Sequence, residues 1–246
     1  MIPTFCEREN IVQLVEEILA LNLGVNILIV DDNSPDGTGK IADELAKKYP
    51  QVQVLHRQGI GGRGSAGIAG LKYLLAQGAD FIIEMDADFS HQPCYLPLFL
   101  EKIKEADIVI GSRFVKGGKD IGRGMRHLIT LFANVYIRNV LGLKIYDCTS
   151  GYRCFRRKVL EAINLDNTVS LGPAIVQELL YKACLRGFRV VEIPVVFVER
   201  RRGKSTFNFR IMLEGFLMVL ILKFLFSKIR GELTAKEIER ISGGKL

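Results

Sequence analysis

Two groups of carboxylates in this chain have the spacing needed to hold a divalent cation. Asp31 and Asp32 are adjacent, and Asp86 and Asp88 are separated only by Ala87. Each group follows a short apolar run that is typical of a buried strand. Carboxylate oxygens are the ligands that Mg²⁺ and Mn²⁺ prefer. Aspartate also commonly ends strands and begins turns, so either group alone is weak evidence for a metal site.

Positive charge is concentrated in two short stretches. The net charge of the chain is +7, from 34 Lys and Arg against 27 Asp and Glu. Residues 111–126 and 185–210 hold more than this excess, so the remainder is mildly acidic. Such clusters indicate a confined anionic ligand or a membrane face. They have neither zinc-finger spacing nor an aromatic-rich basic strand, and we therefore expect no nucleic-acid partner.

A glycine-rich segment lies between a predicted strand and a predicted helix. Residues 59–64 fit the GxGxxG pattern of dinucleotide-binding loops. The segment does not follow the first strand, however, and Asp80, at the offset of a ribose-binding acid, precedes its strand instead of ending it. An NAD-dependent oxidoreductase is therefore the disfavoured interpretation. A flexible loop that covers a ligand is the plainer one.

Alternating helix and strand patterns must position these groups. Apolar residues recur at helical spacing over residues 10–23, 38–49, 93–105, 128–141 and 176–186, and from the glycine-rich loop to residue 75. Short apolar runs predict strands at residues 25–30, 52–55, 81–85, 107–110 and 190–198, and residues 149–155 fit a strand or a turn. This order favours a single α/β domain with a mostly parallel sheet flanked by helices. Both acidic groups should then share the edge where parallel strands end.

Six motifs occur in order along residues 2–210. They are Pro3-Thr4-Phe5-Cys6-Glu7-Arg8-Glu9-Asn10-Ile11, Val30-Asp31-Asp32-Asn33-Ser34-Pro35-Asp36-Gly37-Thr38, Met85-Asp86-Ala87-Asp88-Phe89-Ser90-His91-Gln92-Pro93, Gly111-Ser112-Arg113-Phe114-Val115-Lys116-Gly117-Gly118, Thr149-Ser150-Gly151-Tyr152-Arg153 and Arg200-Arg201-Arg202-Gly203-Lys204-Ser205. Together they resemble the dolichol-phosphate (polyprenyl-phosphate) mannose synthases. These enzymes are family 2 glycosyltransferases with the nucleotide-diphospho-sugar transferase fold, called GT-A.

The resemblance implies a donor site, a metal and an acceptor site. The positions matching nucleotide-sugar contacts are Pro3, Phe5, Glu7, Val30, Asp32, Asp86, Ala87, Asp88, Arg113 and Arg200. The DxD carboxylates Asp86 and Asp88 match ligands of Mg²⁺ or Mn²⁺, and Ser90 stands where some relatives have a further ligand. The positions matching acceptor-phosphate contacts are Arg126, Thr130 and Arg202. The resemblance assigns the catalytic roles to Asp86, Asp88, Arg113, Arg126 and Arg200.

The implied reaction is transfer of a hexose, mannose from GDP-mannose, to a polyprenyl (dolichyl) monophosphate with inversion at the anomeric carbon. One alternative is a UDP-sugar donor such as UDP-glucose, because Cys6 stands where the family usually has Asn. Another is a non-catalytic protein that binds a nucleotide or a lipid phosphate. For Asp147, which matches an active-site Asp of the family, base catalysis and structural hydrogen bonding both stay open.

We expect residues 1–210 to form the GT-A catalytic domain, and residues 211–246 to form an apolar interfacial helix with a polar tail. The apolar stretch at residues 211–226 is shorter than a membrane-spanning helix requires. We therefore predict a cytoplasmic protein that lies peripherally on the membrane surface. The five cysteines form no CxxC pair, which favours a reducing compartment. The three histidines are isolated in sequence, and we expect them on the surface or in loops.

Overall fold

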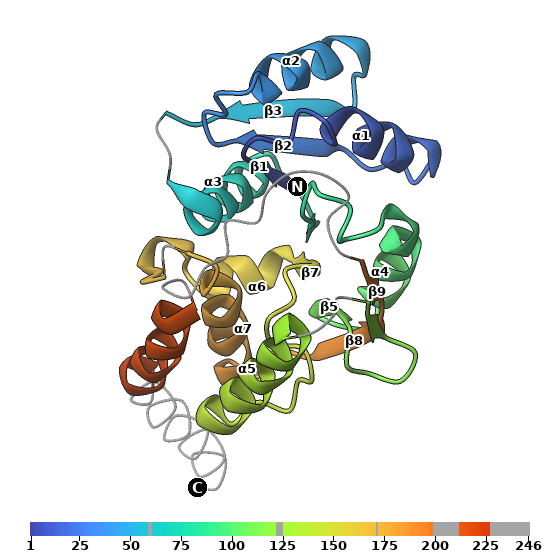
Figure 1. Ribbon diagram of the computed structural model, residues 1–246. Helices are drawn as coiled ribbons and strands as arrows, with labels where there is room; N and C mark the ends of the chain where they lie inside the picture. The colour runs from blue at the N-terminus through green and yellow to red at the C-terminus, as the bar shows by residue number, and fades with distance from the viewer. Residues whose placement is uncertain (59–60, 122–124, 171, 199–211, 227–246) are drawn as a thin grey trace, which may run out of the picture.

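The structure is a computed structural model that describes residues 1–58, 61–121, 125–170, 172–198 and 212–226 (Figure 1). In its N-terminal half, the strands β1 (Ile2–Thr4), β2 (Ile27–Asp31) and β3 (Val52–His56) pair in that order, all parallel. The helices α1 (Ile11–Ala20), α2 (Thr38–Lys48) and α3 (Gly62–Ala76) cover them.

Strand β2 shows why helices lie on both faces of this sheet. All of its residues are buried, and successive side chains point to opposite faces. Leu28 and Val30 belong to the apolar cluster that includes residues of α3. Ile27 and Ile29 belong to the second cluster, which includes residues of α1 and α2. A strand that is apolar on both faces needs a helix layer on each.

The second half of the sheet is mixed. The strands β4 (Phe81–Glu84), β7 (Arg153–Arg156), β5 (Ile108–Ser112) and β8 (Val190–Pro194) pair in that order. β7 is antiparallel to both of its neighbours, and β5 is parallel to β8. The backbone amide of Met85 donates to the carbonyl oxygen of Met1 at 3.1 Å, which brings the end of β4 beside β1. The short strands β6 (Lys119–Asp120) and β9 (Val196–Phe197) pair in parallel and form a separate two-stranded sheet.

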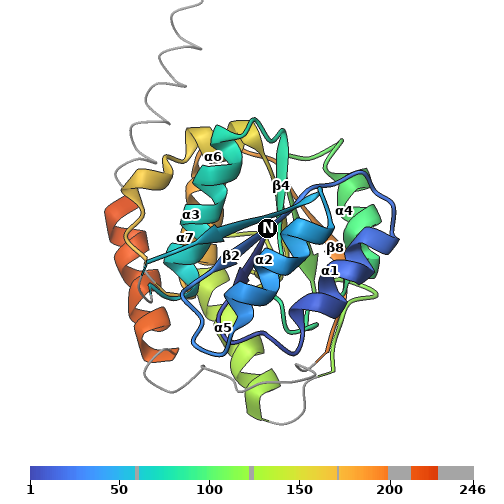
Figure 2. The same cartoon turned by 90° about the horizontal axis from the view of Figure 1, so that it is seen from above.

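Helices flank this second half on both sides. They are η1 (Pro93–Tyr95), α4 (Leu96–Lys102), α5 (Met125–Leu141), α6 (Arg157–Ala162), η2 (Leu165–Asn167) and α7 (Ile175–Leu185), followed by a helix at residues 212–226. Figure 2 shows residues 212–226 beside α7 on one side of the molecule, with α1 and α4 on the other. Val219 and Leu222 of that last helix join the buried cluster of the sheet. Within the described ranges, no helix is both long and apolar enough to cross a membrane.

The expected α/β architecture with a mostly parallel sheet is confirmed, and several boundaries differ. The glycine-rich segment was predicted as a loop, but α3 already begins at Gly62. The predicted strand at residues 190–198 divides at Val195 into β8 and β9, whose partners belong to different sheets. The segment at residues 149–155 turns before β7, which begins only at Arg153. The predicted domain boundary at residues 210–211 lies outside the described residues.

Candidate active site

The first two motifs meet at the carboxyl edge of β1 and β2. The backbone amide of Asp32 donates to the carbonyl oxygen of Thr4 at 3.0 Å, and that of Glu7 donates to the hydroxyl of Thr38 at 3.0 Å. Phe5, just after β1, is 38% exposed and can offer its ring to a ligand. Val30 is fully buried, so its side chain packs in the core instead of facing this edge.

The carboxylate of Asp32 holds the start of α3. Its Oδ2 accepts hydrogen bonds from the backbone amides of Gly61 at 3.1 Å and Gly62 at 2.8 Å, and Oδ1 pairs with the Arg57 guanidinium. In dinucleotide-binding proteins the equivalent amides at a helix N-terminus bind phosphate. Here a carboxylate of the chain itself occupies them. This arrangement speaks against the dinucleotide interpretation of the GxGxxG pattern.

The DxD segment forms a largely buried turn after β4. Asp86 is half-buried, whereas Ala87, Asp88 and Ser90 are buried. Oδ1 of Asp88 accepts the backbone amide of Ser90 at 3.0 Å, which fixes the carboxylate against its own turn. The prediction that both acidic groups lie at the same sheet edge agrees with this placement, since β1 joins the end of β4.

His91 lies in the bend between β4 and η1, which agrees with the expectation of a surface or loop position, but its side chain is buried. It is 5% exposed, and its ring stacks on Tyr152 with the ring centroids 4.9 Å apart. Its Nδ1 accepts the backbone amide of Asp86 at 2.9 Å. Burial lowers the pKa of His91, although the carboxylate of Asp86 opposes this shift. The neutral ring therefore helps to fix the Asp86 backbone.

Arg63, in the first turn of α3, is a site residue that the sequence analysis missed. Its Nε and Nη2 donate to Oδ1 of Asp86 at 3.0 and 2.7 Å. Its Nη1 lies 3.4 Å from Oε1 of the buried Glu84. Burial alone would lower the pKa of Arg63, but Asp86 and Glu84 raise it above its usual value, so the side chain stays charged. The sequence signal that could have identified Arg63 as a site residue is its position inside the GxGxxG pattern.

The donor set at the DxD segment fits a cation that is shared with a ligand. Within the part of the chain that the structure describes, no group of three or more His, Cys, Asp or Glu could hold a metal. Mg²⁺ sites commonly use one or two carboxylates and complete the shell with substrate phosphates and waters. Asp86 and Asp88 suit that arrangement, and they do not suit a metal held by protein ligands alone.

A buried ion pair joins Arg113 of the fourth motif to Asp147, two residues before the fifth motif. Nε and Nη2 of Arg113 donate to the two oxygens of Asp147, both at 2.7 Å, and the Arg113 amide donates to the same carboxylate. The amide of Ser150 and the hydroxyl of Thr149 donate to it as well. Burial would raise the pKa of Asp147, but these hydrogen bonds, led by those from Arg113, hold it below its usual value. A carboxylate so fully engaged is a poor base, so the structure favours its structural role.

Glu192 and Asn134 brace this ion pair from two other elements. On β8, Glu192 accepts the backbone amides of Tyr146 at 2.8 Å and Asp147 at 2.9 Å. On α5, the amide group of Asn134 donates to the hydroxyl of Thr149 at 3.0 Å, and its oxygen accepts the amide of Cys148. The loop that carries Asp147 is therefore held on both sides, which orients the guanidinium of Arg113.

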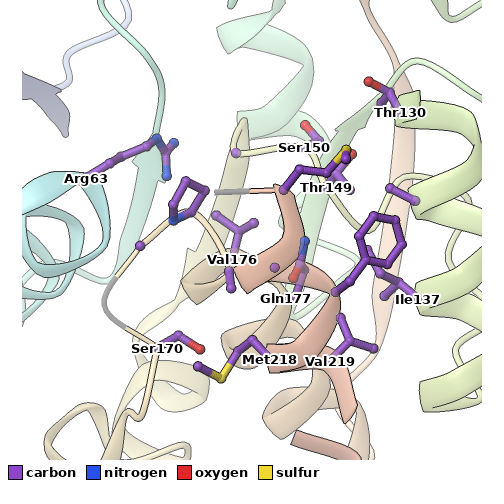
Figure 3. Close-up of a pocket in the computed structure, with 18 of the residues that line it drawn as sticks. Arg63, Thr130, Ile137, Thr149, Ser150, Ser170, Val176, Gln177, Met218 and Val219 are labelled. Atoms are coloured by element: carbon purple, nitrogen blue, oxygen red, sulfur yellow. The ribbon is translucent and has the colours of Figure 1, made fainter. Parts of the chain in front are cut away.

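A cavity of about 650 Å³ begins at these charged groups and continues between α5, α7 and the helix at residues 212–226 (Figure 3). Its polar end is lined by Arg63, Asp86, His91, Arg113, Thr149 and Ser150. Its apolar part is lined by Ile129, Ala133, Tyr136, Ile137, Val176, Phe216, Met218 and Val219, among others. The cavity therefore suits a ligand with an anionic head and a hydrocarbon body.

The motifs at this site are those of a described family. Residues 1–163 match the family described as glycosyl transferase family 2. This chain belongs to that family. The glycosyltransferase is 43% identical over 206 residues to the undecaprenyl-phosphate mannosyltransferase of Micrococcus luteus, covering 83% of this chain and 85% of that protein.

Further relatives of this glycosyltransferase carry similar names. It is 44% identical over 208 residues to the polyprenol monophosphomannose synthase of Mycolicibacterium smegmatis, covering 83% of this chain and 78% of that protein. It is 41% identical over 211 residues to the dolichol-phosphate mannosyltransferase of Pyrococcus furiosus, covering 83% of this chain and 57% of that longer protein. The resemblance inferred from the motifs is thereby confirmed.

Solved structures confirm the GT-A fold of the glycosyltransferase. The glucosyl-3-phosphoglycerate synthase of Mycobacterium tuberculosis, crystallised with Mn²⁺, UDP-glucose and phosphoglyceric acid, superposes with a TM-score of 0.66. The two chains are 17% identical, and the match covers 92% of this chain and 77% of that one. At this identity the likeness establishes the fold alone.

The structure describes the positions of only some of the predicted site residues of the glycosyltransferase. It brings Asp86, Arg113 and Thr130 to one cavity. It places Pro3, Phe5, Glu7 and Asp32 at the neighbouring sheet edge. Arg200, Arg202 and the side chain of Arg126 lie outside the described residues, so their assigned contacts stay predictions.

Proposed function

We propose that this glycosyltransferase transfers mannose from GDP-mannose to a polyprenyl monophosphate and inverts the anomeric carbon. The observation that carries the proposal is the continuous cavity that runs from Asp86 of the DxD segment into an apolar channel. A sugar-nucleotide at the sheet edge and a lipid phosphate in the channel would meet at its polar end. The names of the relatives point to mannose as the transferred sugar and to a polyprenyl phosphate as its acceptor.

The donor lies along the first motifs in this proposal. Pro3, Phe5, Glu7 and Asp32 surround the base and ribose at the ends of β1 and β2, and Val30 and Ala87 support them from the backbone. Arg200 contacts the donor phosphates. Mg²⁺ or Mn²⁺, bound by Asp86 and Asp88 with Ser90 beside them, would stabilise the charge that develops on the leaving nucleoside diphosphate. Solved relatives of the same fold contain these ions.

The acceptor needs positioning more than it needs a base. A lipid monophosphate is already anionic near neutral pH, so its oxygen can attack without first losing a proton. A bond forms between that oxygen and C1 of the sugar while the bond from C1 to the diphosphate breaks, and the electron pair leaves with the nucleoside diphosphate. Arg126, Thr130 and Arg202 hold the acceptor phosphate, and Arg113 contributes charge at the polar end of the cavity, since arginine forks suit phosphate.

The donor and the stereochemistry are tested together in one assay. Purified protein is incubated with a short polyprenyl phosphate, Mn²⁺ or Mg²⁺, and a panel of radiolabelled nucleotide sugars. We expect lipid-linked product from GDP-mannose, with the opposite anomeric configuration to the donor. If UDP-glucose were the one nucleotide sugar that is turned over, the donor would be UDP-glucose instead of GDP-mannose. Retained configuration, or a covalent glycosyl-enzyme, would exclude a single displacement.

We further propose that α5 and the helix at residues 212–226 lie on the cytoplasmic membrane surface. The two helices touch through Phe216, whose ring centroid is 5.8 Å from that of Phe132 and 4.9 Å from that of Tyr136. Both expose large apolar side chains, which on α5 are Met125, Leu128, Leu131, Phe132 and Val135, and on the second helix are Leu213, Leu217, Leu220, Ile221, Phe224 and Leu225. An apolar surface of this kind beside a channel for a lipid is suited to a bilayer.

Charged substitutions on this surface are expected to weaken vesicle binding. Phe132→Glu and Phe224→Glu each remove a ring that is 63% or 77% exposed and place a charge at the lipid boundary. We expect a loss of at least about tenfold in partitioning, because burying such a side chain is worth about 1.5–3 kcal/mol. Sedimentation with phosphatidylcholine–phosphatidylglycerol vesicles measures it. Phe81→Glu, which alters an exposed ring on β4, is the control, and equal losses in all three variants would contradict the proposal.

A further inference from the structure

We propose that the Arg63 guanidinium is an internal counter-cation for the DxD segment, and that a divalent metal binds Asp86 by exchanging with it. The inference rests on the metal site proposed above and adds a competitor to it. Arg63 belongs to none of the motifs that indicated the function. Figure 3 shows its side chain extending from α3 into the cavity.

The Arg63 guanidinium contacts the same Asp86 carboxylate to which a divalent metal would bind. Two of its nitrogens donate to the same oxygen of Asp86, at 3.0 and 2.7 Å, and the third lies 3.4 Å from Glu84. Oε1 of Glu84 is buried and has no hydrogen-bond partner within the described part of the chain. The guanidinium therefore supplies the positive charge for two carboxylates whose charges would otherwise repel each other.

The neighbouring backbone leaves room for this guanidinium. Gly151 follows Thr149 and Ser150 in the motif before β7, and a Cβ atom placed on it would lie 2.4 Å from Nη2 of Arg63. An alanine there would have to push the end of the arginine side chain aside. The backbone of Gly151 does not have a positive φ, so alanine can adopt its conformation. The chain thus offers a way to move Arg63 without removing any charge.

Exchange follows from the electrostatics of the site. A carboxylate oxygen that already accepts two hydrogen bonds from a cation attracts a second cation less strongly. A metal ion bound to the same oxygen would also lie close to the guanidinium, and the two positive charges would repel each other. A metal that arrives alone must therefore displace Arg63. A metal that arrives with a nucleoside diphosphate brings negative charge, to which the released guanidinium can then bind. We infer that the metal-free site resists the ion alone and accepts it together with the donor.

The test is the affinity for Mn²⁺ alone, measured by titration calorimetry without nucleotide or acceptor. We expect Arg63→Gln and Gly151→Ala each to bind Mn²⁺ at least about tenfold more tightly than the unaltered protein. Arg157→Gln is the charge-matched control, because Arg157 pairs with Glu161 on α6 at 3.3 Å, and its affinity should equal that of the unaltered protein. Circular dichroism confirms that each variant is folded.

Each outcome bears on the exchange. Equal Mn²⁺ affinity in the unaltered protein, Arg63→Gln and Gly151→Ala overturns the exchange and leaves the metal site standing. Weaker binding by Arg63→Gln also overturns it and makes Arg63 a supporting residue of the metal site. Absence of Mn²⁺ binding in every variant, even with GDP present, overturns the proposed metal site itself and the exchange with it.

Discussion

Alanine at Asp86 or Asp88 is expected to lower turnover by about 10³-fold or more, since each substitution removes one of the two carboxylates available to a metal that stabilises the leaving diphosphate. Asp86→Ala also leaves Arg63 without its closest partner, and Asp88→Ala removes the acceptor for the Ser90 amide. The measurement is kcat for transfer of labelled mannose to a short polyprenyl phosphate at saturating metal.

Asp166→Ala is the matched control for this loss. Asp166 has the same carboxylate, its side chain is 79% exposed, and it pairs with Lys72 at the surface. We expect kcat of this variant to be unchanged. Residual turnover near the original value in Asp86→Ala and Asp88→Ala would remove the DxD segment from the reaction. If the unaltered protein shows no turnover with any nucleotide sugar, the alternative of a non-catalytic binding protein takes its place.

Arg113→Ala is expected to destabilise the fold as well as to abolish transfer. The side chain of Asp147 is fully buried and that of Arg113 is 10% exposed, so the substitution leaves a carboxylate buried without its counter-ion. Breaking such a pair by removing one partner costs about 3–5 kcal/mol. Urea unfolding of the unaltered protein and the variant measures the difference at pH 7. The surface pair of Arg157 and Glu161 is worth about 0–1 kcal/mol, so Arg157→Ala is the control.

The pH dependence of that difference gives a second readout. The pKa of Asp147 is lowered in the folded protein, so the stability that its charged form contributes is present above the unfolded pKa of about 3.9. It is lost as the pH falls through the folded value. The gap in unfolding free energy between the unaltered protein and Arg113→Ala should therefore narrow below about pH 3.9. A gap that stays constant over this range would contradict a role for the charge on Asp147.

The sequence predicted those elements of the fold that depend on local pattern. Apolar residues at helical spacing located α1, α2 and α7 to within a few residues, and the run ending in Asp31 located β2. The DxD group could be placed at the sheet edge because parallel strands carry their following loops to the same side. Boundaries failed where the local signal was ambiguous, as at Gly62, where glycines suggested a loop and α3 already begins.

Some features of the candidate site were likewise predicted from the sequence, and others needed the tertiary structure. The resemblance carried by the six motifs implied a metal-assisted glycosyltransferase, whereas the spacing of the carboxylates and the basic clusters indicated only a divalent-cation site and a confined anionic ligand or a membrane face. The sequence assigned the position of Val30 to the donor site, and the structure shows that its side chain is buried in the core, so only its backbone is left for that contact. The two possible roles of Asp147 stayed open until its five hydrogen bonds, from Arg113, Thr149 and Ser150, were visible.

By itself, the sequence determined the family and the α/β class, and it predicted which carboxylates lie at the carboxyl edge of the sheet. Only the tertiary structure decided that β7 runs antiparallel between β4 and β5, that Glu192 holds the loop of Asp147 from 45 residues away, and that Arg63 pairs with Asp86. Spacing along the chain reports a local period, because a helix or strand repeats over a few residues. Contacts between distant segments depend on how those elements pack, and no local period records them.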